Sequence, residues 1–582
     1  MIPRNEHPNP QRERREWLCL NGEWEFEIDK SVSGAARRLF EKEHLEGKIT
    51  VPFCPESVLS GVGDTDFLNC VWYRRDLVLP EAWQGGRVLL HFGAVDHTAT
   101  VYLNGKKVGT HSGGFVSFTF DITSHLVAGK NSLCVCAKDD TRDGRFGSGK
   151  QSLEYASHGC YYTRVTGIWQ TVWLEHVPEA YIRNFKLVPD ATNGTLTLET
   201  EVCGAGTLTA KALYKGKPVG DLSLTASSNT VCGTMTLTEK HLWEVGNGRL
   251  YDLTLTFGED TVNSYFGLRS VAFDGKRFLL NGRSVYQRLV LDQGMYRDGI
   301  YTAPCDEAMQ NDIQISLAAG FNGARLHQKV FEPRFLYHCD KAGYLVWGEY
   351  GDWGIDYTDL ECLPPFLSEW QEIIERDFNH PSIIGWCPTN EVWPTQDVGD
   401  KKRPEVREAL YHLTKALDRT RPCIDASGGK HTKSNDIFDM HSYIQDPARF
   451  EEVFSNTDVA SLLAAWGVDP KTNAAITHRL GSYTKEQPFF VSEYGGIKWD
   501  VNSGNADAWG YGNAPKTEQE FIERYRSLTN TLLGNPSMCG FCYTQLYDTE
   551  QEVNGLYTYD RKPKFDMEIF REINTKKAAI EE

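Results

Sequence analysis

Two glutamates, Glu391 and Glu493, each follow a short run of apolar residues, 383–387 and 488–491. Such runs are typical of buried strands. A pair of carboxyl groups across a glycosidic bond can hydrolyse it, because one protonates the leaving oxygen while the other attacks the anomeric carbon. A separation of about 5–5.5 Å between them gives retention of configuration. The alternative is structural: each glutamate caps the next helix or pairs with an arginine such as Arg325. Position alone leaves both interpretations open.

The two glutamates can act together only if a common scaffold joins their strands. From about residue 275 onward, strand-like and helix-like patterns alternate. Met309, Ile313 and Leu317 recur at the spacing of one helix face. Further helices are expected near 333–342, 365–378, 404–418, 517–533 and 565–575. Eight such strand–helix units in about 300 residues are typical of a TIM barrel, in which strands four and seven lie roughly opposite each other. Both glutamates would then face one pocket.

Other polar residues end the remaining predicted strands, and the loops at these carboxyl ends build the site of a barrel. The fifth strand is expected near 423–427 and the sixth near 436–443. The polar side chains placed at strand ends in this way are Asp292, Arg325, His327, Glu349, Asn390, His441, Tyr443, Gln545 and Asp548.

The N-terminal half of the sequence has a different residue pattern. Residues 1–178 read as many short β-branched or aromatic runs separated by turns, which predicts a β jelly roll. Asn104-Gly105 is a hairpin signal within it. In residues 179–272, apolar and polar residues alternate along short runs, which predicts a seven-strand immunoglobulin-like β-sandwich. Residues 273–582 are the predicted (β/α)8 TIM barrel. The fold class is therefore multidomain.

Composition excludes several classes of protein. The charge is 61 basic minus 79 acidic residues, or −18, which disfavours nucleic acid and membrane surfaces as partners. No run approaches the ~18 apolar residues of a membrane span, and residues 1–16 contain no apolar signal segment. Fifteen cysteines in core-like contexts indicate reduced thiols. We therefore expect a cytoplasmic protein, and a homo-oligomer is compatible with the sequence.

No metal or cofactor is expected. The stretch 144–151 is close to a nucleotide-binding P-loop but has Gln151 where Ser or Thr must hold magnesium. Cys539 and Cys542 have the spacing of a zinc or redox pair, yet they lie inside a predicted strand without a second pair.

Four segments carry a resemblance to a known family. Gly385 to Glu391, reading Gly-Trp-Cys-Pro-Thr-Asn-Glu, resembles the acid/base segment of glycoside hydrolase family 2, and Phe489 to Gly496 resembles its nucleophile segment. The stretches 71–75 and 166–170 are similar to its N-terminal jelly roll. The family's order of jelly roll, sandwich and barrel matches the order predicted above.

The resemblance implies roles for individual residues. Glu391 would be the general acid/base and Glu493 the nucleophile. Asn390 would bond the sugar 2-hydroxyl, a contact that strengthens in the transition state. Tyr443 would orient the nucleophile, and Arg325 would keep it ionised.

The sequence also departs from the family pattern. His327 stands one position earlier than the usual histidine after the strand-two arginine, and Asp292 follows an altered strand one. The Asn-x-Lys clamp of the family's glucuronidases should lie just before 560–564, but the chain has Glu552 and Asn554 there. A glucuronate carboxylate would meet no matching cation from that loop.

Three further substrate contacts are expected. Asp139 or Asp140 falls where family β-galactosidases send an aspartate from the jelly roll into the sugar pocket, and an acidic turn is the alternative. Trp499 belongs to a set of barrel-mouth aromatics that suit a sugar platform. That set is Trp347, Trp353, Trp393, Trp499 and Trp509. The polar loop 143–151 could form a rim of the pocket.

The expected activity is retaining exo-hydrolysis of terminal non-reducing β-D-galactosides or closely related sugars. The alternatives are a β-D-galactofuranosidase or α-L-arabinofuranosidase, since the glycone pocket is reshaped, and a β-glucuronidase of the same family. A non-catalytic carbohydrate-binding protein is the remote alternative, and it predicts the loss of a catalytic glutamate, whereas Glu391 and Glu493 are both present.

Overall fold

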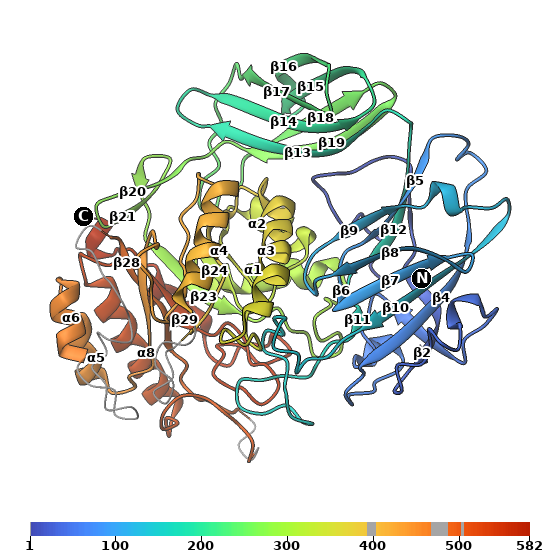
Figure 1. Cartoon of the computed structure of the whole chain (residues 1–582). Helices are drawn as coiled ribbons and strands as arrows, with labels where there is room; N and C mark the ends of the chain where they lie inside the picture. The colour runs from blue at the N-terminus through green and yellow to red at the C-terminus, as the bar shows by residue number, and fades with distance from the viewer. Residues whose placement is uncertain (1, 393–402, 467–486, 502–505, 582) are drawn as a thin grey trace.

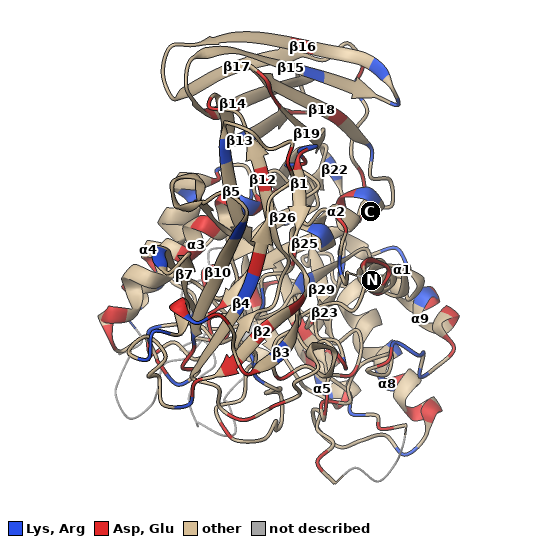
Figure 2. Cartoon of the chain, turned by 90° about the vertical axis from the view of Figure 1, so that its right-hand side faces the viewer, with Lys and Arg blue, Asp and Glu red and all other residues tan. Residues whose placement is uncertain are grey.

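The computed structural model describes residues 2–392, 403–466, 487–501 and 506–581. Figure 1 shows three bodies: an N-terminal β-domain in blue on the right, a β-sandwich in green at the top, and a larger α/β body that runs from yellow-green to red. Basic and acidic residues occur on all three (Figure 2). No described helix combines the length and apolar character needed to cross a bilayer.

The N-terminal domain is a jelly roll of two antiparallel sheets with a buried apolar core between them. The larger sheet has the order β3(Gly47–Val51), β2(Gly22–Ile28), β4(Cys70–Val78), β10(Lys130–Lys138), β7(Thr98–Leu103), β8(Lys106–Ser112). The smaller has the order β1(Trp17–Cys19), β12(Val172–Val177), β5(Arg87–Phe92), β9(Phe118–Asp121), and β6(Val95–Asp96) pairs with β11(Gly167–Ile168).

Strand β7 illustrates why these segments pair. Its residues alternate between buried and half-buried positions, so one face fills the core. The predicted hairpin follows it, with Asn104 and Gly105 at φ 52° and 75° between β7 and β8. This left-handed pair matches the twist of the two strands.

The second domain is a sandwich of seven antiparallel strands, as predicted. One sheet has the order β13(Tyr181–Asp190), β14(Thr195–Cys203), β17(Thr230–Thr236). The other has the order β16(Lys217–Ala226), β15(Gly206–Tyr214), β18(Leu250–Phe257), β19(Asp260–Gly267). A small sheet of β20(Val271–Asp274), β21(Arg277–Leu280) and β22(Arg283–Ser284) leads into the third domain.

The third domain is a TIM barrel whose parallel strands are buried except for Arg288 on β23 and Gly348 on β25, which are half-buried. Its sheet has the order β26(Ile383–Cys387), β25(Leu345–Glu349), β24(Gly323–Leu326), β23(Gln287–Asp292), β29(Gly540–Thr544), β28(Phe489–Gly495), β27(Phe438–Ser442). The described helices are α1(Asp306–Ala318), α2(Pro333–Ala342), α3(Leu363–Asp377), α4(Pro404–Leu417), α5(Pro447–Phe454), α6(Val459–Trp466), α8(Glu518–Leu533) and α9(Met567–Asn574).

The fifth strand, expected at 423–427, is not a regular strand. Cys423 forms an isolated parallel bridge to Trp386 of β26, and Ser427 forms one to Asn390, three residues beyond the strand. Toward β27, one backbone hydrogen bond, from Asp436 N–H to the carbonyl oxygen of Cys423 at 3.1 Å, is joined by side-chain ones. The side chain of Asp436 accepts the backbone N–H of Cys423 at 2.9 Å, and that of Asn435 accepts the N–H of Asp425 at 3.4 Å. Polar side chains thus close the barrel between its fourth and sixth strands.

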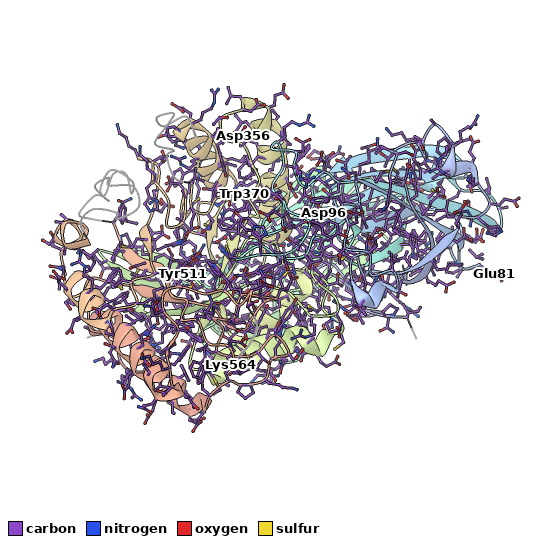
Figure 3. All side chains as sticks on the ribbon, turned by 90° about the horizontal axis from the view of Figure 1, so that it is seen from below. Glu81, Asp96, Asp356, Trp370, Tyr511 and Lys564 are labelled. Atoms are coloured by element: carbon purple, nitrogen blue, oxygen red, sulfur yellow. The ribbon has the colours of Figure 1, made fainter. Side chains whose placement is uncertain are left out.

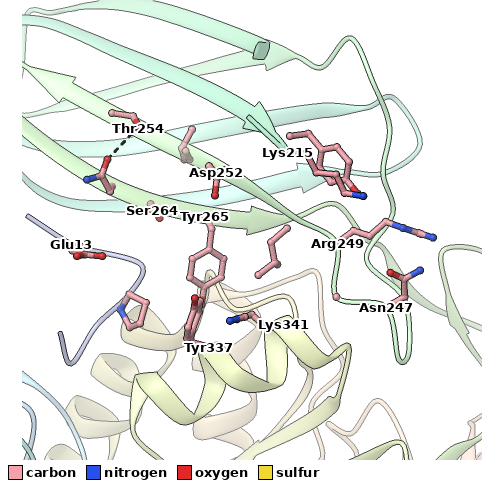
Figure 4. A pocket seen from close by; sticks show the side chains of 16 residues that line it. Glu13, Lys215, Asn247, Arg249, Asp252, Thr254, Ser264, Tyr265, Tyr337 and Lys341 are labelled. Atoms are coloured by element: carbon pink, nitrogen blue, oxygen red, sulfur yellow. Dashed lines mark hydrogen bonds between the residues drawn. The ribbon is translucent and has the colours of Figure 1, made fainter. Parts of the chain in front are cut away.

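Buried ion pairs join the domains. Arg14 donates to Glu175 of the jelly roll at 2.7 Å and to Asp260 of the sandwich at 2.9 Å. Between the sandwich and the barrel lies an open groove of about 900 Å³. Figure 4 shows Tyr265 of β19 next to Tyr337 of α2 in the lining of this groove, and their ring centroids are 5.3 Å apart.

Candidate active site

Glu493 is buried near the end of β28 and is held from two sides. The guanidinium of Arg325, on β24, donates from Nη1 to Oε1 of Glu493 at 3.0 Å and to the carbonyl oxygen of Ser492 at 2.9 Å. The hydroxyl of Tyr443 donates to Oε2 of Glu493. The arginine of strand two and the tyrosine after strand six therefore both contact this carboxyl group.

These neighbours set the charge of Glu493. Burial by itself raises the pKa of a carboxyl group, because it removes water from the charged form. His441, His327 and Arg325 outweigh burial and, together with the hydrogen bond from Tyr443, lower the pKa of Glu493 to about 2. The side chain is therefore ionised at neutral pH, which is the state that a carboxylate nucleophile needs.

Arg325 is completely buried and organises the floor of the site. Its Nη2 donates to Glu349 at the end of β25 at 2.5 Å and to Oδ1 of Asn390 at 3.1 Å. Nδ1 of His327 lies 2.9 Å from Glu349 and 3.9 Å from Glu493. A buried guanidinium needs such compensation, so the contacts fix the arginine in one position.

Glu391 lies beyond the end of β26 in a left-handed conformation, with φ 54°. This conformation costs a non-glycine residue about 1–3 kcal/mol unless surrounding contacts hold it. Its backbone N–H donates to the carbonyl oxygen of Ser427 at 2.9 Å, within one of the two bridges of the irregular fifth segment. The side chain of Glu391 is 24% exposed, against 4% for Glu493, so it is the more accessible of the two carboxyls.

His441, on β27, joins the two carboxyl groups. Its Nδ1 lies 2.6 Å from Oε1 of Glu391 and 3.4 Å from Oε2 of Glu493. One side-chain oxygen of each glutamate and the histidine nitrogen all lie within 4.8 Å of one another. The two carboxyls are therefore as close as a double-displacement mechanism requires. Burial alone would lower the pKa of His441, but the two glutamates raise it above its ordinary value.

Asn390 directly precedes Glu391, the acid/base candidate, and most of its polar groups are hydrogen-bonded to neighbouring protein residues. Its Oδ1 accepts from Arg325, its backbone N–H donates to Asp352 at 2.9 Å, and its carbonyl oxygen accepts from the indole of Trp353 at 3.3 Å. Its buried Nδ2 has no hydrogen-bond partner among the described residues. A buried donor without a partner is costly, and a sugar hydroxyl would satisfy it.

Aromatic rings line the approach to the pair. Tyr443 stacks on Tyr511 with ring centroids 3.4 Å apart, and Trp509 meets Tyr511 edge-on at 4.8 Å. Tyr511 lies within the barrel half of the molecule (Figure 3). Trp353 packs against Tyr161 of the jelly roll at 5.3 Å. Flat rings of this kind suit the apolar faces of a sugar.

Two loops of the jelly roll dock onto the barrel mouth. In the first, the backbone N–H of Ser148 donates to the carbonyl oxygen of Trp353 at 2.7 Å, as a rim formed by 143–151 would require. In the second, Tyr162 donates its hydroxyl to Glu552, and Gln551 donates to the carbonyl oxygen of Tyr161 at 3.0 Å. The site is therefore built from two domains.

Lys150 comes from the first of these loops and is buried beside the glutamates. Its Nζ lies 5.4 Å from the ring of Trp353, and the described residues give it no hydrogen bond or ion pair. Burial lowers the pKa of Lys150, but Glu552, Glu493 and Glu391 outweigh that effect and raise it above its ordinary value. The ammonium group is therefore charged and lacks a direct partner in the described part of the site.

Sequence reasoning did not assign a role to Lys150, His441 or Glu552. His441 stood at a predicted strand end, and that signal could have selected it. Glu552 occupies the place where the resemblance expected part of a basic clamp. Lys150 had no signal beyond its loop, because nothing in the sequence shows which jelly-roll loop reaches the barrel.

For four of the predicted substrate contacts, Asp292, Asp139, Asp140 and Trp499, the described residues show contacts other than the two glutamates. Asp292 is buried, accepts from the hydroxyl of Tyr547 at 2.5 Å, and has a pKa that burial raises to about 6. Asp139 and Asp140 line a separate jelly-roll pocket. Trp499 packs edge-on against Phe521 at 6.2 Å. These contacts do not bring any of the four to the catalytic pair.

The other barrel-mouth aromatics have mixed placements. Trp347 is fully buried and donates to Gln287 at 2.8 Å, so it belongs to the barrel interior. Trp353 and Trp509 lie near the glutamates, as described above. Trp393 falls outside the residues that the structure describes.

Three family models match successive parts of the chain. The "Glycosyl hydrolases family 2, sugar binding domain" matches residues 64–178, "Glycosyl hydrolases family 2" matches 180–269, and its "TIM barrel domain" matches 271–578. Together they follow the three domains of the structure.

Individual proteins show the same relationship. A β-glucuronidase of Paenibacillus borealis is 24% identical over 492 residues, which cover 75% of this chain and 79% of that protein. A β-galactosidase of Thermoanaerobacter pseudethanolicus is also 24% identical, over 76% of this chain but only 58% of its own length. The crystal structure of a Ruminococcus gnavus β-glucuronidase in complex with uronic isofagomine superimposes with a TM-score of 0.80 at 18% identity, covering 98% of this chain and 99% of that one.

The last similarity establishes the fold, and the barrel model alone spans more than half of the chain. With two buried strands delivering a close pair of glutamates at the barrel mouth, the chain belongs to glycoside hydrolase family 2.

Proposed function

We propose that this glycosidase cleaves terminal non-reducing β-glycosides of a neutral sugar with retention of configuration, β-D-galactosides being the leading substrate. The observation that carries this proposal is the pair of carboxyls whose nearest atoms lie within 4.8 Å, one fully buried and ionised, the other more exposed. That asymmetry suits the two different tasks of a retaining mechanism.

In the proposed mechanism each glutamate has its own step. Glu493 attacks the anomeric carbon while Glu391 protonates the leaving oxygen, so the aglycone departs as an alcohol and a glycosyl ester forms on Glu493. Glu391 then removes a proton from water, which attacks the same carbon and frees Glu493. Tyr443 and Arg325 hold the nucleophile in place through both steps.

The preference for a neutral sugar rests on the loop after β29. Glu552 lies there, buried, and accepts from Tyr162 and from Nδ2 of Asn554 at 3.0 Å. The nearby Lys564 is already bonded to Asp548 at 2.5 Å and to two carbonyl oxygens. The carboxylate of Glu552 can accept hydrogen bonds from sugar hydroxyls, and the amide of Asn554 can donate or accept them. A carboxylate on the sugar would instead be repelled by the buried charge of Glu552.

Lys150 favours a second candidate, a β-glucuronidase. Lys150 is 8% exposed and its ammonium has no direct partner among the described residues, and a C6 carboxylate would supply one. Several of the similar proteins are β-glucuronidases. Against this candidate stands Glu552, whose carboxylate already faces the charge of Lys150.

A panel of nitrophenyl glycosides separates the candidates. It contains the β-D-galactopyranoside, the β-D-galactofuranoside, the α-L-arabinofuranoside and the β-D-glucuronide, each tested with the wild type, Lys150→Met and Glu552→Gln. Lys107→Met is the matched control, because Lys107 is exposed on β8 of the same domain.

The proposal expects the best kcat/KM with a neutral sugar and a loss in Glu552→Gln. The second candidate expects the glucuronide to be best and Lys150→Met to lose about 30-fold or more on it alone, the equivalent of roughly 2 kcal/mol. A preference for either furanoside would support the alternative of a β-D-galactofuranosidase or an α-L-arabinofuranosidase. If the wild type hydrolysed none of the four glycosides, the proposal would be contradicted.

Two further proposals accompany this function. We place the enzyme in the reducing cytoplasm, for which the support is that all fifteen cysteines are unpaired. We also keep a homo-oligomer as a proposal, to be decided by the mass of the protein in solution.

A further inference from the structure

His441 contacts both catalytic carboxyl groups, and its other ring nitrogen reaches a hydrogen-bond network behind them. Nε2 lies 3.2 Å from Oγ of Ser427, which in turn donates to Oδ2 of Asp439 at 2.8 Å. Asp439 also accepts from the backbone N–H of Gly428 at 3.0 Å and from the hydroxyl of Ser492. The network links the acid/base side of the site to the strand that carries the nucleophile.

Asp439 acts in this network as an acceptor only. Burial raises the pKa of its carboxyl group, but His431, which lies 3.1 Å from Oδ1, and the other donors outweigh burial and lower the pKa. His431 is itself held between Asp439 and Asp425, the latter at 2.7 Å. The buried acid is therefore ionised.

The network determines one proton on His441. Ser427 has a single hydroxyl proton, which it donates in the hydrogen bond to Asp439. Its Oγ can therefore only accept a hydrogen bond from His441. Nε2 of His441 must therefore carry a hydrogen. Nδ1 is left facing Oε1 of Glu391 at 2.6 Å, a distance that requires a proton between the nitrogen and the oxygen.

The backbone is shaped to admit this ring. Gly428 has φ 61°, and a Cβ on it would lie 2.2 Å from two carbon atoms of the His441 ring. Any side chain at this position would displace the histidine. The glycine, the serine and the aspartate together fix the ring plane against Glu391.

We propose that His441 and Glu391 hold the acid/base proton jointly across their 2.6 Å contact, so that the pair, rather than Glu391 alone, supplies the proton to the leaving group. This rests on the acid/base role proposed above for Glu391. In the first step the shared proton leaves with the aglycone oxygen, and both partners remain without it. In the second step the proton that Glu391 takes from water returns to the shared position.

Other ionisable groups face the pair and contribute to its titration. They are Glu493, Arg325 and Asp439 from the barrel strands, Tyr443 and Tyr511 from the barrel loops, and Lys150, Cys160 and Tyr161 from the jelly roll. Because Nδ1 of His441 and Oε1 of Glu391 share one proton across 2.6 Å, removing the histidine removes one of the two atoms that hold it. The protonated form of the site should then be lost at lower pH.

The test compares His441→Gln with the wild type in pH profiles of kcat/KM. We expect the basic limb to move down by about one pH unit or more, the usual size for loss of a close ionisable partner. The loss should also grow with the pKa of the leaving group. His338→Gln is the control, since His338 is buried and bonded to Asp306 at 2.8 Å outside the site. A uniform loss at all pH values and for all leaving groups would overturn the proposal.

A second measurement does not depend on the folding of that variant. In ¹⁵N-histidine NMR spectra, one ring should keep Nε2 protonated while its Nδ1 signal titrates at the midpoint of the basic limb, and Glu391→Gln should abolish this coincidence. The proposal would also be overturned if Nδ1 of His441 titrated at a pH unrelated to the basic limb of the kcat/KM profile and did so unchanged in Glu391→Gln. Azide rescue of Glu391→Ala, measured alongside, tests the acid/base role separately, so the two failures are distinguishable.

Discussion

Arg325 donates to Glu493 at 3.0 Å with both side chains almost fully buried, so the charge of the proposed nucleophile is fixed before substrate arrives. The contact crosses the barrel sheet from β24 to β28, whose strands are separated by two others. It therefore depends on closure of the barrel, and it couples the activity to the integrity of the scaffold.

Removing this cation should shift the acidic limb of activity. Glu493 works as an anion, and its pKa of about 2 keeps it ionised throughout the usual assay range. In Arg325→Met the pKa of Glu493 should rise by about 1–3 units, so kcat/KM should fall on going from pH 6 to pH 3 more steeply than in the wild type. Arg325→Lys keeps the charge and should retain the wild-type slope. Equal slopes in all three proteins would contradict this account of the charge.

Glu391→Ala tests the assignment of the acid/base residue. Substrates with poor leaving groups should lose far more rate than activated aryl glycosides, because the latter need little protonation. Added azide should restore turnover and yield a β-glycosyl azide. Equal losses for all leaving groups, with no response to azide, would show that another residue protonates the glycosidic oxygen.

Asp140→Asn should leave the activity nearly unchanged. Asp140 is exposed and lines a jelly-roll pocket that does not include the glutamates. A surface substitution of this kind typically changes the free energy of unfolding by less than about 0.5 kcal/mol, so the fold should be kept. Because the pocket that Asp140 lines does not include the glutamates, kcat/KM for a galactoside should stay within about twofold of the wild type. A loss of tenfold or more would instead place this aspartate in the sugar pocket.

The sequence predicts much of the scaffold because its periodic signals are strong. The helix expected at 333–342 is α2, and the strands before Glu391 and Glu493 are buried along their whole length. The segment 423–427 resembles a strand in composition, but Asn435 and Asp436 take its backbone donors. Competition from side chains of this kind is invisible to pattern reading.

The site could be predicted only in part. Residues at strand ends were found because a barrel gathers them at one face, and Glu391, Glu493, Arg325 and Tyr443 come together there. Asp292 ends a strand as well, yet its carboxyl turns to Tyr547. Lys150 reaches the glutamates from another domain, and the docking of that domain depends on contacts between loops that no local pattern specifies.

The central claim is that Glu493 is the nucleophile of a retaining glycosidase, and covalent trapping tests it most directly. A 2-deoxy-2-fluoro glycoside of the preferred sugar, with an activated leaving group, slows the second step and lets the ester accumulate. We predict a stoichiometric adduct whose digest carries the sugar on the peptide containing Val491 to Tyr494, at Glu493. A label on a different carboxyl group, or a first-formed product of inverted anomeric configuration, would contradict the claim.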